Sequence, residues 1–232
     1  MRLNRKQKIL RNGLACLVLI LAIYASLGFP PYTVAGMCRA VQRDYLLPEL
    51  TPVYTLKESH KYSDDWVNRR YTFIIARCED SYFSFLYDRN LLENSRVAAR
   101  GVKVGEGALC MARKGVMYVA GDFAGVERAT AVVRATNGIE FRDFILEGER
   151  LGDEVFGFVY DDGGWPFAPE GTPVEEMSLG EIAEYWYRTP SGGGYSLDHA
   201  ELPVTVTLMD AAGETVETLE LSVGTYDLHS WY

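Results

Sequence analysis

Aromatic residues are the side chains of this sequence that could form a recognition site, and several stand in short clusters. Trp165 is followed two positions later by Phe167, and Tyr185, Trp186 and Tyr187 are consecutive. Exposed rings can stack on sugars or anchor a protein interface, whereas most aromatic residues fill a core. Tyr185 and Tyr187 cannot both share the helix face of Trp186, so one of them should lie near the surface. We therefore predict a ligand-binding aromatic patch of Trp165, Tyr185, Trp186 and Tyr187.

Residues suited to catalysis or metal binding form no recognised motif. The sequence has three histidines and lacks HExxH, GxSxG, P-loop and dinucleotide-binding patterns. Asp198 and His199 are adjacent, and because neighbours point apart in a strand, we interpret them as solvated loop residues. Asp161 and Asp162 precede two glycines and could offer oxygen ligands to Ca²⁺, but tight turns favour the same residues. We predict no catalytic residue, no metal site and no cofactor.

Two cysteines, Cys78 and Cys110, fall on expected strands. A disulfide between them could persist in an oxidising compartment. The alternative is a pair of buried free thiols that behave as small apolar side chains, and we favour it because neither cysteine belongs to a CxxC motif. The sequence also lacks an Asn-x-Ser/Thr glycosylation site, which favours a bacterial source.

Charge is distributed unevenly along the chain. Seven of the 23 Lys and Arg residues precede Asp44, the first acidic residue, whereas all 32 acidic residues lie at or after it. The remaining 16 basic residues against 32 acidic ones leave a net charge of −16 on residues 44–232. Phosphate backbones would repel so acidic a domain, so we expect no nucleic-acid partner.

An apolar segment follows the basic N-terminus. Residues 13–29 are almost wholly apolar, and five basic residues precede them. We predict a cytoplasmic tail over residues 1–12 and a transmembrane signal anchor over residues 13–31, which Pro30 and Pro31 should end. The positive-inside rule places the C-terminal domain outside the cell membrane. A cleaved signal peptide has the same charge pattern and remains the alternative.

Residues 32–48 predict an amphipathic juxtamembrane helix or stalk. Val34, Met37, Cys38, Val41 and Tyr45 recur at helical spacing, and Pro48 should close the helix. Its apolar face would pack on the exported domain, which we favour, or lie on lipid headgroups or a partner protein.

Residues 49–232 change to the alternating pattern of strands. The clearest hairpins join residues 71–76 to 82–87, 108–112 to 116–120, 129–135 to 139–146, and 204–208 to 216–223. Residues 155–160 form a further strand, and Ser178 and Glu181 match a helix capping box. This pattern predicts a mainly β fold, an antiparallel sandwich or barrel-like domain with one or two short helices. Two subdomains divided near residues 161–173 are an alternative.

These features predict a single-pass membrane protein that presents an extracytoplasmic β-rich binding or interaction domain. The bilayer would hold residues 13–31, and the domain would meet an envelope polymer or a membrane protein. The alternative function is a cell-envelope hydrolase with a pair of carboxylates, since glycosidases use such pairs.

Overall fold

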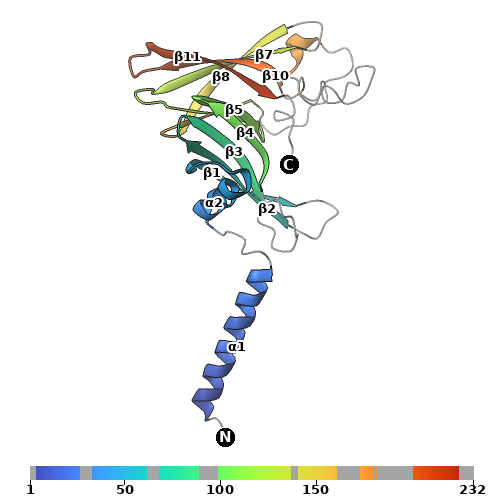
Figure 1. Ribbon diagram of the computed structural model, residues 1–232. Coiled ribbons are helices and arrows are strands. Elements are labelled where there is room, and N and C mark those ends of the chain that lie inside the picture. Colours follow the sequence, from blue (N-terminus) through green and yellow to red (C-terminus); the bar gives the residue numbers. More distant parts are fainter. Residues whose placement is uncertain are drawn as a thin grey trace.

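The computed structural model describes residues 4–26, 33–61, 68–88, 99–136, 141–160, 173–179, 181 and 201–224. These residues form a mainly β structure with two sheets, which confirms the predicted fold class. Every hydrogen-bonded pair of neighbouring strands among them is antiparallel. Figure 1 shows the two sheets stacked along the molecule, with one helix beneath the lower sheet and another extending away from it. The four-stranded sheet contains β1 (Thr51–Lys61), β2 (Asn68–Cys78), β3 (Ser81–Asp88) and β4 (Ala99–Glu106). The seven-stranded sheet contains β5 (Ala108–Arg113), β6 (Val116–Gly121), β7 (Arg128–Thr136), β8 (Phe141–Gly152), β9 (Val155–Val159), β10 (Glu201–Met209) and β11 (Thr215–Gly224).

The first helix, α1 (Arg5–Ser26), is long and apolar enough to cross a membrane. Its 22 residues rise about 33 Å, which matches the hydrocarbon thickness of a bilayer. None of its apolar window Arg5–Tyr24 is buried inside the protein. The helix begins eight residues before the apolar run predicted at residue 13, and residues 27–31 of the predicted span lie outside the described part of the chain.

The second helix, α2 (Val34–Tyr45), covers the outer face of the four-stranded sheet. Thr33 caps its N-terminus by accepting a hydrogen bond from the Gly36 amide at 3.1 Å. Met37, Cys38 and Val41 are each 1% exposed and share a buried cluster with residues of β2, β3 and β4. The part of the predicted apolar face formed by Met37, Cys38 and Val41 therefore packs on the β domain, as expected, whereas Tyr45 at its C-terminal end is 43% exposed.

The seven-stranded sheet curls into a nearly closed barrel. Its strand order is β11-β10-β7-β8-β9-β6-β5, and the two outermost strands, β11 and β5, lie next to each other. Strand β8 turns the corner, because its first half pairs with β7 and its second half with β9. Gly148 lies at this corner, and a Cβ atom there would come within 2.7 Å of the Phe158 ring and 2.9 Å of the Ala129 carbonyl oxygen.

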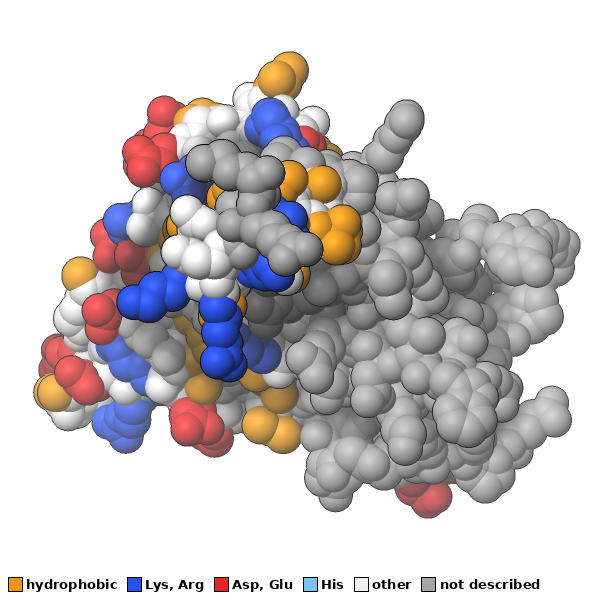
Figure 2. Space-filling view, turned by 90° about the horizontal axis from the view of Figure 1, so that it is seen from below, with side chains coloured by type: hydrophobic (Ala, Val, Ile, Leu, Met, Phe, Trp, Pro, Cys, Tyr) orange, Lys and Arg blue, Asp and Glu red, His pale blue; other side chains and the backbone are white. Residues whose placement is uncertain are grey.

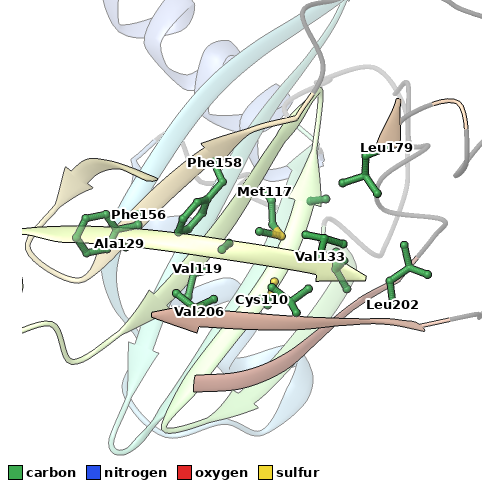
Figure 3. Close-up of a cluster of buried hydrophobic side chains, with 14 of the residues drawn as sticks. Cys110, Met117, Val119, Ala129, Val133, Phe156, Phe158, Leu179, Leu202 and Val206 are labelled. Carbon is green, nitrogen blue, oxygen red and sulfur yellow. The ribbon is translucent and has the colours of Figure 1, made fainter. Parts of the chain in front are cut away.

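Buried side chains occupy the barrel interior. Figure 3 shows Cys110, Met117, Val133 and Val206, which come from different strands, pointing toward one another. Small residues of β7, among them Ala129 and Ala131, leave room for the rings of Phe156 and Phe158. Side chains thus fill this barrel, as small barrels require for stability.

A third buried cluster joins the sheet to the barrel. Successive residues of β2 point to opposite faces, so Ile74 and Ala76 meet α2 while Phe73 and Ile75 meet the barrel. The barrel contributes the outward-facing residues Leu109, Met111, Tyr118, Ala120 and Val155. The sheet is therefore covered on both faces, which explains the nearly continuous apolar run of β2.

The predicted hairpins are present. β2 pairs with β3, β5 with β6, β7 with β8, and β10 with β11. Lys114 and Gly115 join β5 to β6 with φ angles of 51° and 74°, the left-handed conformation that tight hairpin turns need. The Asn137–Gly138 turn lies outside the described residues.

Strands β1 and β4 were missing from the predicted hairpins. Both are edge strands of the four-stranded sheet. Pro52 lies at a register shift in β1, and Gly101 of β4 has φ of 60°, so both strands carry residues that disfavour a strand assignment.

The capping box forms as predicted. The Ser178 amide donates to the Glu181 carboxylate at 2.6 Å, and the Glu181 amide donates to the Ser178 hydroxyl at 3.2 Å. The rest of that helix is not among the described residues. The predicted division near residues 161–173 also falls largely outside them, but β7 before it and β10 after it pair in one sheet.

Candidate functional site

The aromatic patch predicted at Trp165, Tyr185, Trp186 and Tyr187 lies outside the described residues, as do Asp161, Asp162, Asp198 and His199. The patch stays a prediction. Within the part of the chain that the structure describes, no group of three or more His, Cys, Asp or Glu side chains could hold a metal ion.

Cys78 and Cys110 do not pair in a disulfide and lie in different buried clusters. Cys78 faces α2 on one side of the four-stranded sheet, whereas Cys110 points into the barrel. The favoured interpretation, two buried thiols acting as small apolar side chains, is the one the structure has. Cys38 is a third buried thiol, and burial raises its pKa from 9.0 to about 11.

The junction between sheet and barrel holds a compact polar cluster. Arg113, at the end of β5, donates two hydrogen bonds to the Glu58 carboxylate of β1, at 2.7 and 2.6 Å. Both residues are 7% exposed. The Lys114 ammonium, from the adjacent turn, lies 3.6 Å from the same carboxylate. Glu58 is therefore a buried anion held by two cations.

Aromatic rings lie beside this ion pair. Tyr54, Phe73 and Tyr118 form a triangle with ring centroids 5.3 to 6.4 Å apart. Burial, followed by the neighbouring Tyr54, raises the pKa of the Tyr118 hydroxyl, so this phenol stays protonated at neutral pH. A neutral phenol packed among rings contributes apolar contact and a hydrogen bond to the junction.

A second polar cluster holds the other end of the junction. Glu154, in the turn between β8 and β9, accepts a hydrogen bond from Arg77 at 2.8 Å and one from the Tyr82 hydroxyl at 2.9 Å. Burial and the Glu154 carboxylate raise the pKa of Tyr82. Glu58 is paired with Tyr71 across the sheet, so Arg77 lies six residues, or about 20 Å, further along β2. The two clusters thus fix the sheet on the barrel at separate points.

Arginine side chains also secure the two ends of the barrel. Arg142 donates to the Met177 carbonyl and stacks over Phe144, with its guanidinium 4.5 Å from the ring centroid. Met177 and Leu179 are buried in the barrel core, so this segment covers one end. At the other end, Arg150 donates to the carbonyls of Val126 and Asp153.

The outer wall formed by β11, β10, β7 and β8 faces away from the four-stranded sheet (Figure 1). One row across it runs from Thr218 through Thr207 and Thr130 to Glu147. The next row contains Glu220, whose carboxylate accepts a 2.9 Å hydrogen bond from Thr205, and ends at Ile145, which is 70% exposed. We call these residues of β7, β8, β10 and β11 the outer barrel face.

No family model, curated protein or solved structure matches the chain.

Proposed function

We propose that the protein is a membrane-tethered interaction module, with α1 in the cell membrane, its N-terminus in the cytoplasm and the β domain outside. The observation that carries this proposal is α1 itself, an apolar helix that is unburied along the whole window Arg5–Tyr24. Unburied apolar side chains on this scale need a non-aqueous environment or a partner. The basic residues at its start favour a cytoplasmic N-terminus.

The β domain has the properties of a rigid presenting scaffold. Two polar clusters and a shared apolar cluster hold the sheet to the barrel, and side chains fill the barrel. The alternative function, a cell-envelope hydrolase, needs a pair of available carboxylates. The junction offers none, because arginine engages both Glu58 and Glu154.

The outer barrel face is the surface we propose for partner binding. It combines hydroxyl and carboxylate groups with the exposed apolar residues Phe141 and Ile145. With the net charge of −16 on residues 44–232, it suits a neutral or cationic partner, either an envelope polymer or another membrane protein.

Photocrosslinking in intact cells tests the proposal. A photoreactive residue at Ile145, on the outer barrel face, should capture a discrete partner. The same residue at Val104, which is 57% exposed on β4, serves as the matched control. Equal capture at both positions, or none at any position of the outer barrel face, would contradict the proposed binding surface.

Orientation is tested separately with reporter fusions. A reporter active outside the cytoplasm should be active when fused after Gly224 and inactive when fused before Arg5. The opposite pattern would refute the proposed topology.

A further inference from the structure

The exposed side of α2 ends in an unusual residue. Leu46, at the C-terminal cap, has φ of 56° and is 91% exposed. Glycine and asparagine occupy this left-handed position at little cost, whereas a bulky side chain is strained there. Neither packing within the protein nor conformational preference explains a leucine at this position. A contact of its side chain outside the described fold would explain it.

The surroundings hold Leu46 in place. The Leu47 amide donates to the Gln42 carbonyl at 2.9 Å, and the Gln42 side chain donates to the Pro48 carbonyl at 2.9 Å. Leu47 packs against the buried cluster beneath α2. The cap is thus fixed on both sides, and Leu46 points outward from a rigid base.

The exposed neighbours of Leu46 include side chains that favour a membrane interface, together with Asp44, whose carboxylate accepts a 3.1 Å hydrogen bond from Arg43. Tyr45 is 43% exposed, and Arg39 and Arg43 lie on the exposed side of α2 because Met37, Cys38 and Val41 take the opposite side. Tyrosine prefers the headgroup level, and arginine can reach lipid phosphates while its stem covers apolar surface. Figure 2, viewed from the side of α1, shows basic, acidic and hydrophobic side chains interspersed on the described part of this end of the molecule, which includes α1 itself. On α2 itself the exposed Arg39 and Arg43 outnumber the single carboxylate of Asp44, in contrast to the net negative charge of the domain.

Chain length places α2 close to the bilayer. Six residues separate Ser26, the end of α1, from Thr33, the cap of α2. Even a fully extended connection of this length spans about 25 Å. If α1 crosses the membrane, α2 must start within that distance of its end.

We propose that the exposed side of α2 rests on the phospholipid headgroups of the bilayer that α1 crosses, with Leu46 and Tyr45 inserted and Arg39 near phosphate groups, while Arg43 is paired with Asp44. This inference depends on the proposed membrane anchor. It assigns α2 two contacts, the β sheet on one side and the lipid surface on the other. The β domain would then have a fixed height and tilt over the membrane.

Lipid-depth quenching of the full chain in phospholipid nanodiscs tests the inference. Cys38, Cys78 and Cys110 are buried, so a fluorophore attached in detergent to Cys16 reports on α1. A fluorophore on Leu46→Cys, in a Cys16→Ser background, reports on the cap. Val216→Cys, on β11 where Val216 is 53% exposed, is the matched control. Spin-labelled lipids should quench the probe at position 46, which should lie at a depth of about 5–10 Å in the headgroup region. They should leave the probe at position 216 unquenched.

The outcomes separate the inference from the function on which it depends. Absence of lipid quenching at Cys16 would refute the membrane anchor. If lipid quenches the probe at Cys16 but leaves the probe at position 46 as unquenched as the one at position 216, the membrane anchor stands and the headgroup contact of α2 is overturned. Shielding of the probe at 46 from water-soluble quenchers without lipid quenching would indicate a protein contact, such as a second copy, and would also overturn it.

A second variant series distinguishes membrane contact from a structural role. With the fluorophore on Tyr45→Cys, Leu46→Gly should lower lipid quenching, whereas Leu46→Met should retain it. Because glycine relieves the backbone strain, Leu46→Gly should unfold at an equal or higher denaturant concentration. Unchanged quenching in Leu46→Gly would contradict the insertion of Leu46.

Discussion

The buried ion pair of Glu58 and Arg113 determines what the junction between sheet and barrel tolerates. Moving a carboxylate out of water is unfavourable, and the two short hydrogen bonds from Arg113 offset that cost. Such a pair adds little net stability compared with well-packed apolar residues. It does make the loss of one partner severe, because the other charge stays buried.

Arg113→Met should therefore lower the free energy of unfolding by about 3–5 kcal/mol. The double variant Glu58→Leu with Arg113→Met should recover much of that loss, since it also removes the buried carboxylate, which in Arg113→Met keeps only the 3.6 Å contact to Lys114. Denaturant titration of the detergent-solubilised chain measures both. Arg134→Met is the control, because Arg134 and Asp143 form an exposed pair worth at most about 1 kcal/mol. Equal losses in Arg113→Met and Arg134→Met would contradict the role of burial.

The buried thiol of Cys38 predicts a pH dependence. Its pKa is raised to about 11 in the folded protein from 9.0 for a free thiol, because burial disfavours the thiolate. Above pH 9 the unfolded state therefore binds fewer protons than the folded state. The stabilising contribution of Cys38 should be complete below pH 9 and decrease as the pH rises from 9 to 11.

Thiol labelling measures the same property directly. In a Cys16→Ser background, the rate of Cys38 modification should continue to rise up to about pH 11 instead of levelling near pH 9, because the thiolate is the reactive form. Val41→Ala should accelerate this modification by loosening the α2 contact, and Val216→Ala, on the exposed part of β11, should not. A rate that levels near pH 9 would show that Cys38 is not buried as described.

At the scale of elements, the corner of β8 decides whether the seven strands close. This strand pairs with β7 up to Glu147 and with β9 from Gly148 onward. The sheet must bend there, and the close approach of the Phe158 ring and the Ala129 carbonyl leaves no room for a side chain. A bend of this kind is what glycine provides in barrels.

Gly148→Ala should destabilise the protein by about 1–3 kcal/mol, because the new methyl group overpacks a closed core. Gly152→Ala is a matched control in the same strand, since a Cβ atom there would lie 3.7 Å from its nearest neighbour, the Val53 carbonyl oxygen. Thermal unfolding of the two variants compares them. A similar midpoint for both would argue against the corner as the limiting contact.

At the scale of the whole molecule, the sheet and the barrel share the apolar cluster at their junction. Phe73 and Ile75 of the sheet and Tyr118 and Val155 of the barrel are each at most 5% exposed there. Separating the two parts would expose residues of both. We therefore expect one cooperative unit rather than two independently stable ones.

Hydrogen exchange tests this expectation. The most protected amides of β2 and of β6 should exchange with the same free energy of opening, because both need the global transition. Arg77→Ala removes one of the two polar contacts of the junction and should lower protection in both strands together. Loss of protection in β2 alone would show that the sheet opens independently of the barrel.

Much of the secondary structure could be predicted from local pattern. The alternation in residues 204–208 and 216–223, the helical spacing from Val34 to Tyr45 and the capping box of Ser178 and Glu181 all appear in the structure as expected. Each of these signals involves residues close together in the chain. Strands β1 and β4 gave weaker signals, because Pro52 interrupts the first and Gly101 the second.

The sequence by itself determined the apolar N-terminal helix, the mainly β fold and most of its hairpins, because periodicity and turn chemistry are local properties. The tertiary structure decided which faces meet: α2 on one side of the four-stranded sheet, the barrel on the other, and Cys78 and Cys110 in separate clusters. It also brought Glu58 to Arg113 and showed Leu46 exposed in a left-handed conformation. The contact between Arg77 and Glu154 joins residues 77 positions apart, and Arg128 pairs with Met209 across 81 positions. No local pattern encodes such pairings, since they depend on how the whole chain buries its apolar surface.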